Sequence, residues 1–126
     1  MKGSDTNVFY QIANFINENP FVRESARPGL CRMWSGQSLQ FLRGGDSAFG
    51  EYEVEAREVT LPDGVSHTFL RISIDGKGYI MDGTGVDGFP AYFGLEEHAP
   101  KHLLDSQPDV MINTQEQTFL SREREI

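Results

Sequence analysis

The sequence predicts an α+β fold in which N-terminal helices pack on an antiparallel sheet. In the first third of the chain, apolar residues recur at helical spacing, and from Glu51 onward the apolar period changes to two. The segment Asp75-Gly76-Lys77-Gly78 is typical of a tight hairpin turn between two strands. A chain of 126 residues can bury one modest core, so we expect residues 1–126 to form a single domain.

Two helices are predicted from apolar stripes and from residues that end helices. The first is expected over Val8–Asn17, where the apolar residues share one face, and Asn19-Pro20 ends it. A connector at Phe21–Gly29 leads to the second helix. That helix is expected over Cys31–Leu42 and ends at Gly44-Gly45.

Strands are expected at Glu51–Thr60, Val65–Ile74 and Gly78–Thr84, because apolar residues alternate with polar ones there. Farther along, we expect a short helix within residues 95–104 and a strand or loop around residues 110–112. The core is expected between the helices and one face of the sheet. Its predicted members are Phe9, Ile12, Phe15, Trp34, Leu39, Leu70 and Ile72.

Composition and charge exclude several classes of partner. The formal net charge is −8 and basic residues are scattered, which argues against nucleic acid and anionic membranes. No apolar stretch is long enough to cross a membrane, and residues 1–5 lack the apolar region of a secretory signal. A single cysteine excludes an internal disulfide framework and a cysteine-based zinc site. We therefore expect no cofactor, no metal and a cytoplasmic location.

Three residues are candidates for nucleophilic chemistry. Cys31 lies at the start of the second helix, where the helix dipole favours thiolate over thiol. His67 opens an apolar strand and can take the thiol proton. Asp82, on the next strand, can orient the histidine and hold its charged form. Together they predict a Cys-His-Asp catalytic triad, with Asp87 as the reserve orienting acid.

Each of these residues also has a structural interpretation. Free cysteine is often a small buried hydrophobe, a strand histidine is often only a polar face residue, and Asp-Gly commonly ends a strand. The hairpin adds a difficulty, because a two-residue loop at Gly76-Lys77 would place Asp82 opposite Arg71. We expect a wide loop, a bulge or a strong twist to make Asp82 the diagonal neighbour of His67. The His67 face, which also carries Phe69, is expected to lie against the second helix.

His98 and His102 are the competing histidines. Their spacing places them on one face of a helix, and Glu97 is adjacent, so these residues are a candidate metal site. The pair lacks a convincing third ligand, which favours a solvated helix instead.

The chain resembles the papain-like and transglutaminase-like cysteine hydrolases. The resemblance is greatest to the small glutamine deamidase domains of bacterial toxins and effectors, of the dermonecrotic-toxin type. The similar segments are Gly29-Leu30-Cys31, residues 66–72 and residues 79–84. Such a resemblance implies hydrolysis of a glutamine side-chain amide on a target protein. It also implies a possible cognate inhibitor or immunity protein, and a non-Sec route into a target cell as the alternative to the cytoplasm.

One departure from that family concerns the oxyanion. Papain-like proteases usually carry a glutamine shortly before the cysteine as an oxyanion donor, whereas this chain has Arg23-Glu24-Ser25-Ala26. We expect the backbone N–H of Cys31 to be one donor. Ser25 or a backbone amide of the connector is expected to be the second.

The residues predict a thiol-dependent amide hydrolase, and the resemblance points to a glutamine deamidase. Cys31 attacks the amide carbon, His67 protonates the leaving ammonia and then activates water, and Asp82 orients His67. Trp34 either walls the cleft or belongs to the core. The same triad serves cysteine proteases and transglutaminases. A non-catalytic acidic binding or immunity module is the alternative from another class.

Overall fold

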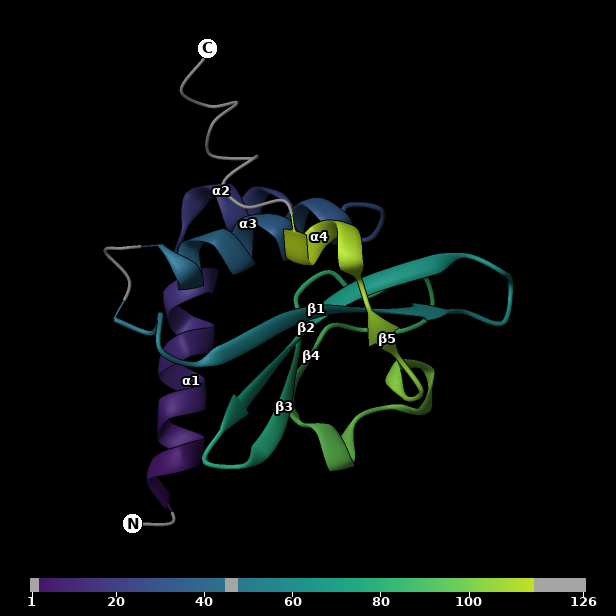
Figure 1. Ribbon diagram of the computed structural model, residues 1–126. Helices are drawn as coiled ribbons and strands as arrows, with labels where there is room; N and C mark the ends of the chain where they lie inside the picture. Colours follow the sequence, from purple (N-terminus) through teal and green to yellow (C-terminus); the bar gives the residue numbers. More distant parts are fainter. Residues whose placement is uncertain (1–2, 45–47, 115–126) are drawn as a thin grey trace.

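The computed structural model, which describes residues 3–44 and 48–114, has an α+β architecture (Figure 1). Its helices are α1 (Gly3–Asn17), α2 (Pro20–Glu24), α3 (Cys31–Arg43) and α4 (Val110–Thr114), with 3-10 helices η1 (Glu96–His98) and η2 (Lys101–Leu103). Its strands are β1 (Glu53–Thr60), β2 (Ser66–Ile74), β3 (Lys77–Asp82), β4 (Tyr92–Leu95) and β5 (Gln107–Pro108). The strands form one antiparallel sheet in the order β4-β3-β2-β1-β5, so the predicted α+β class with an antiparallel sheet is confirmed.

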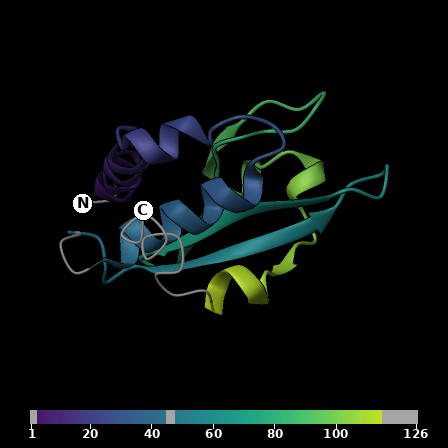
Figure 2. The same ribbon diagram turned by 90° about the horizontal axis from the view of Figure 1, so that it is seen from above.

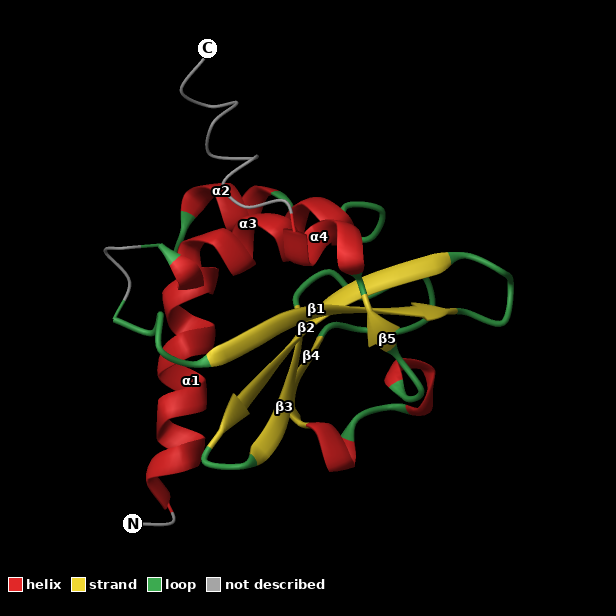
Figure 3. Cartoon of the chain, in the orientation of Figure 1, coloured by secondary structure: helices red, strands yellow, loops and turns green. Residues whose placement is uncertain are grey.

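The main core lies between the helices and one face of this sheet. The long helices gather on one side of the strands (Figure 3), and the view from above shows α3 running along β1 and β2 (Figure 2). The members of this core are Phe9, Ile12, Ile16, Val22, Trp34, Leu39, Leu42, Val54, Ala56, Leu70, Ile72, Ile74, Tyr79, Met81 and Ile112. Burial of such side chains stabilises the fold by about 1.5–3 kcal/mol each.

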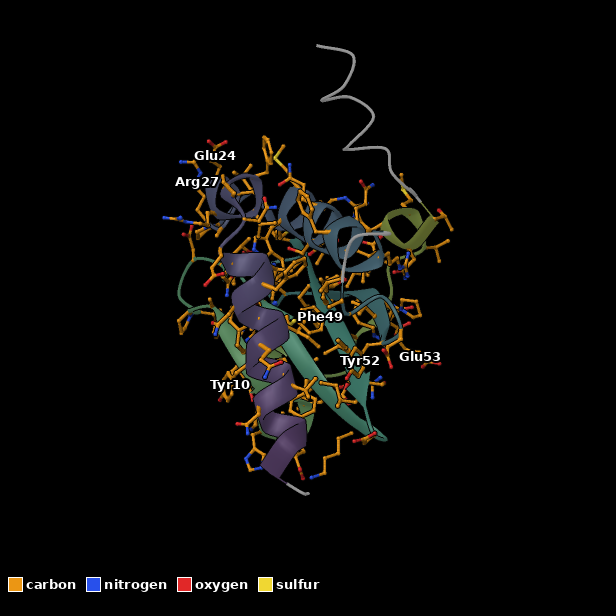
Figure 4. The ribbon with its side chains drawn as sticks, turned by 90° about the vertical axis from the view of Figure 1, so that its left-hand side faces the viewer. Tyr10, Glu24, Arg27, Phe49, Tyr52 and Glu53 are labelled. Atoms are coloured by element: carbon orange, nitrogen blue, oxygen red, sulfur yellow. The ribbon has the colours of Figure 1, made fainter. Side chains whose placement is uncertain are left out.

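Phe15 is the one predicted core residue that the structure places outside this core. Its side chain is 37% exposed, because the face of α1 that meets the sheet carries Phe9, Ile12 and Ile16. The Phe15 ring instead meets Phe49 edge-on, with ring centroids 5.4 Å apart. Figure 4 shows Phe49 beside α1.

A second, smaller cluster covers the opposite face of the sheet. It consists of Val59, Leu61, Phe69, Ile80 and Leu103, with Val86, Tyr92 and Ala99 packed against it. These residues come from the strands and from the segment that contains η1 and η2. Both sheet faces are therefore covered where they carry apolar side chains.

Several elements differ from the sequence prediction. The first helix begins at Gly3 rather than Val8, and the expected connector contains α2, which Asn19 caps by accepting a hydrogen bond from the Phe21 N–H at 2.9 Å. Residues 95–104 hold two 3-10 turns rather than one helix, and residues 110–112 lie in α4 rather than in a strand. Strands β4 and β5 had no counterpart in the prediction. Gly44 follows α3 as expected, and Gly45 lies outside the described residues.

The β2–β3 hairpin turns at Asp75-Gly76, where φ is 50° and 82°. Positive φ at both central residues matches the twist of a two-residue hairpin, and Asp and Gly tolerate it best. Ile74 therefore pairs with Lys77, and Leu70 pairs with Met81. The expectation of a wide loop, a bulge or a strong twist is wrong. A two-residue turn at Asp75-Gly76, rather than at Gly76-Lys77, is enough to make Asp82 the diagonal neighbour of His67.

The outer edge of β1 is closed mostly by side chains. Strand β5 pairs with it only at Arg57 and Glu58. Next to that pairing, the Asn113 side chain accepts a hydrogen bond from the Ala56 N–H at 2.6 Å and donates one to the Ala56 carbonyl at 3.1 Å. Within the described part of the chain, no helix combines the length and the apolar character that crossing a membrane requires.

Candidate active site

Cys31 is the first residue of α3, and this helix start has no side-chain cap. Gly29, with φ of 94°, turns the chain into the helix in a conformation that favours glycine. The N-cap position holds Leu30, and the first turn carries no acidic residue. The first helical bond runs from the Trp34 N–H to the Leu30 carbonyl at 2.9 Å. The backbone N–H groups of Cys31, Arg32 and Met33 therefore take no part in the helical hydrogen bonds of α3. Such groups at a helix start stabilise a negative charge that lies beside them.

His67 and Asp82 form a buried pair at one end of the sheet. Both residues are 0% exposed, and Nε2 of His67 lies 2.8 Å from Oδ2 of Asp82. The second carboxylate oxygen, Oδ1, accepts hydrogen bonds from the backbone N–H groups of Thr84 at 3.3 Å and Gly85 at 3.1 Å. Both oxygens of Asp82 have partners, so its carboxylate is fixed and holds the imidazole in one orientation.

The hairpin register brings this pair together. Leu70 pairs with Met81, so the same register places His67 level with Thr84 and makes Asp82 its diagonal neighbour on the same face. On the other side, Val59 in β1 pairs directly with His67. His67 thus lies between Val59 of β1 and Asp82 at the end of β3.

The Cys31 thiol completes the site beside the imidazole. Burial by itself raises the pKa of the thiol. The interaction of the thiol with His67 and with the backbone N–H of Thr68, together with the charge of His67, outweighs this and lowers the thiol pKa below its ordinary 9.0. For His67, burial lowers the pKa, but the hydrogen bond to Asp82 and the interaction with Cys31 raise it from 6.5 to about 9. Both shifts favour a thiolate–imidazolium pair.

The ring nitrogens of His67 have separate roles in this arrangement. Nε2 is bonded to Asp82, whereas Nδ1 has no hydrogen-bond partner of standard geometry among the described residues. Nδ1 is therefore the nitrogen left to exchange a proton with the thiol of Cys31. This assignment leaves the Asp82 bond intact while the proton moves.

The expectation that the His67 face lies against α3 is wrong. The α3 helix packs on the face that carries Leu70 and Ile72, whereas Phe69 belongs to the cluster on the opposite face. His67 nevertheless interacts with Cys31. Strand β2 begins at Ser66 and its pairing with β3 starts at Leu70, so the edge of β2 beside His67 is open to the start of α3.

Asp109 links the segments on which Cys31 and His67 lie. Its carboxylate is buried, and Oδ2 lies 2.8 Å from Nη1 of Arg32 and accepts a hydrogen bond from the Thr68 hydroxyl at 3.0 Å. Its Oδ1 accepts a hydrogen bond from the Ile112 N–H at 3.1 Å, as an N-cap of α4 does. Sequence reasoning missed Asp109. The pattern of an aspartate before the short apolar run at residues 110–112 would have revealed its capping role, though not its contacts across the fold.

The other candidate donors and acids lie elsewhere. Asp87 is exposed, and Asp82 alone bonds to His67 among these two acids. Ser25 is buried, and its hydroxyl donates to the Val22 carbonyl at 3.0 Å within the turn that ends α2. The expectation that Ser25 serves as an oxyanion donor therefore has no support in the geometry.

The competing histidines do not form a metal site. His98 is exposed, and His102 stacks on Phe89 with ring centroids 4.1 Å apart. Burial lowers the pKa of His102. Within residues 3–44 and 48–114, no group of three or more His, Cys, Asp or Glu side chains is placed to hold a metal ion. A cavity of about 630 Å³ lies beside His102 and Val59, but Cys31 does not line it.

Trp34 belongs to the core rather than to a cleft. Its side chain is 0% exposed and lies against the backbone of Gly83, the residue after Asp82. A Cβ atom added at Gly83 would come within 2.2 Å of the indole ring. The absence of a side chain at Gly83 therefore allows α3 to pack close to the strand end that holds Asp82.

Comparisons with protein-family models, curated proteins and solved structures found no match to this chain, so its function is inferred from the geometry of the site itself.

Proposed function

We propose that this chain is a thiol-dependent amide hydrolase in which Cys31 is the nucleophile, His67 the proton carrier and Asp82 the orienting carboxylate. The observation that carries the proposal is the buried imidazole, bonded to Asp82 through Nε2 and interacting with the Cys31 thiol. Burying ionisable groups costs desolvation free energy. Perturbed pKa values with specific charged partners are common at functional sites.

The reaction starts from the thiolate and the imidazolium. The sulfur lone pair forms a bond to the amide carbon, and the carbonyl π electrons move onto oxygen. When the carbonyl re-forms, the carbon–nitrogen bond breaks, the proton of His67 passes to nitrogen, and ammonia leaves a thioester behind. Neutral His67 then takes a proton from water, and the hydroxide adds to the thioester. Loss of the thiolate releases the carboxylic acid and restores the ion pair.

Backbone N–H groups in the uncapped first turn of α3 supply the oxyanion donors in this proposal. They include the N–H of Cys31, which lies outside the helical ladder. The partial positive charge at a helix start stabilises an oxyanion that forms there. No side-chain donor such as Ser25 is needed.

The proposed substrate is a glutamine side chain on a target protein, and the proposed chain is a toxin or effector with a papain-like or transglutaminase-like core. The resemblance of the segments around Cys31, His67 and Asp82 supports this choice. So does the partly exposed Cys31, which can meet a side chain presented on a protein surface. A cytoplasmic location or non-Sec delivery, and a cognate inhibitor, belong to the same proposal.

The test is the intact mass of candidate target proteins after incubation with the wild-type chain and with Cys31→Ala. Deamidation adds about 1 Da per glutamine, because an amide becomes an acid. Backbone cleavage would assign the site to a protease, and attachment of an added amine would assign it to a transglutaminase. If no product forms and iodoacetamide labels Cys31 only after unfolding, the amide hydrolase is excluded and the acidic binding module replaces it.

A further inference from the structure

Asp109 is a buried charged residue that the proposed reaction does not use. It is 1% exposed, and it precedes α4, far from Cys31 and His67 in the sequence. Its backbone N–H donates to the Ala56 carbonyl at 2.8 Å, which fastens it to the edge of β1. The backbone of Asp109 is therefore held in place by a contact that does not involve Cys31 or His67.

One oxygen of Asp109 connects the neighbours of both reactive residues. Oδ2 accepts from Nη1 of Arg32 at 2.8 Å and from the Thr68 hydroxyl at 3.0 Å. Arg32 directly follows Cys31, and Thr68 directly follows His67. The first turn of α3 and the open end of β2 are thus joined through one atom, one residue away from the thiol and from the imidazole.

We propose that Asp109 is a positioning residue that holds Cys31 and His67 at reacting distance, an inference that rests on the proposed function. The start of α3 has no side-chain cap. The Arg32–Asp109 ion pair instead ties this turn to the sheet, because Asp109 also bonds to Thr68 of β2. The Thr68 backbone N–H, which interacts with the Cys31 sulfur, is held by the same carboxylate through the Thr68 hydroxyl.

The contribution of the ion pair to global stability is expected to be small. The Asp109 carboxylate is buried, but the Arg32 side chain is 46% exposed, so solvent screens this ion pair and it adds little to the free energy of unfolding. The effect of Asp109 should therefore appear in the chemistry of Cys31. Misplacement of reacting groups by even a fraction of their separation slows reactions strongly.

The test measures alkylation of Cys31 by iodoacetamide, in which sulfur displaces iodide, between about pH 5 and pH 10. The variants are Asp109→Asn, which keeps an acceptor for the α4 cap, and Thr68→Val, which keeps the shape and the strand preference. Thr68→Ser restores the hydroxyl. Glu96→Gln is the matched control, because it removes an arginine–carboxylate pair of 2.9 Å at Arg71 on the same strand, β2.

The wild-type chain should react at mildly acidic pH, where an ordinary thiol is protonated. Asp109→Asn and Thr68→Val should react about tenfold more slowly there and match the wild type above the ordinary thiol pKa. Thr68→Ser and Glu96→Gln should match the wild type throughout. The positioning role is overturned if folded Thr68→Val keeps the wild-type profile, whatever its melting temperature, or if Thr68→Ser does not restore that profile. A wild-type chain that itself lacks the acidic reaction would instead overturn the proposed function.

Discussion

The two ends of α3 are built differently. At the C-terminal end, Arg43 donates hydrogen bonds to the Val54 carbonyl at 3.0 Å and to the Asn113 carbonyl at 3.2 Å, and its positive charge complements the helix dipole. At the N-terminal end, Leu30 provides no cap and Cys31 begins the helix. The C-terminal end is anchored by an arginine suited to that position, whereas the donors of the N-terminal end remain for an anion.

This difference suggests that the Cys31 thiolate takes the place of a cap. A capping side chain normally satisfies one of the free N–H groups of the first turn. In α3, the backbone N–H of Arg32 interacts with the Cys31 sulfur and contributes to its lowered pKa. Changes at the N-terminal end should therefore alter reactivity, and changes at the C-terminal end should alter stability.

The largest effect is expected for Cys31→Ala, which removes the nucleophile. Release of ammonia from an N-blocked Gln-Gly dipeptide should fall by at least about ten-thousandfold. The side chain is small and partly exposed, so the melting temperature followed by circular dichroism should change little. Cys31→Ser should give the same two results. Substantial ammonia release by Cys31→Ala would place the nucleophile elsewhere.

A smaller loss is expected for Asp82→Asn. An amide can still occupy the site and bond to the histidine, but it does not stabilise the imidazolium, and it favours the wrong tautomer. Turnover of the same dipeptide should decrease by less than in Cys31→Ala, and the pKa of His67 measured by NMR should fall from about 9 towards 6.5. A pKa unchanged by the substitution would mean that Asp82 does not hold the charge of His67.

The pH dependence of turnover in the wild type should report the ionisation of Cys31 and His67 at the N-terminal end of α3. The reaction needs the thiolate, present above the lowered thiol pKa, and the imidazolium, present below about 9. The kcat/KM of the wild type should therefore rise as pH increases through the thiol pKa and decline as pH increases above about 9.

The free energy of unfolding should decrease with rising pH as His67 loses its proton. Its folded pKa is raised above 6.5, so the stabilisation from charged His67 is complete below pH 6.5 and is lost as pH rises through about 9. The difference in denaturation midpoint between the wild type and His67→Gln should shrink over that interval. A difference that stays constant from acid to alkaline pH would contradict the raised pKa.

The smallest effect is expected at the C-terminal end of α3. Arg43→Gln removes two charged hydrogen bonds to carbonyls and should lower the free energy of unfolding by about 1–2 kcal/mol. Urea denaturation measures this loss. Turnover per folded molecule should equal that of the wild type, and a reduced kcat would show that the two ends are coupled.

Local patterns predicted the main elements and assigned Cys31, His67 and Asp82 to the helix and the two strands on which the structure places them. The helix beginning at Cys31 follows from Gly29, and the strands carrying His67 and Asp82 follow from alternation. The relation between those strands did not follow. The sequence Asp75-Gly76-Lys77-Gly78 allows a two-residue turn at Asp75-Gly76 or at Gly76-Lys77. The structure has the first, in which Asp75 adopts a positive φ.

The contacts of Asp109 required three-dimensional information. It meets Arg32 and Thr68, and hydrogen bonds between residues so distant in the chain leave no periodic pattern. Phe15 was misplaced for a related reason. Helical spacing identifies an apolar stripe, but the width of the stripe that becomes buried depends on the neighbours that pack against it.

The closed edge of β1 has a consequence for self-association. An exposed strand edge can pair with a second molecule through its free N–H and carbonyl groups. Asn113 occupies both backbone groups of Ala56, Arg43 occupies the Val54 carbonyl, and Pro108 in β5 has no N–H to donate. An amide side chain thus imitates a neighbouring strand at this edge. Strand addition by another copy of the chain at β1 would first have to displace it, which hinders edge-to-edge aggregation on this side of the sheet.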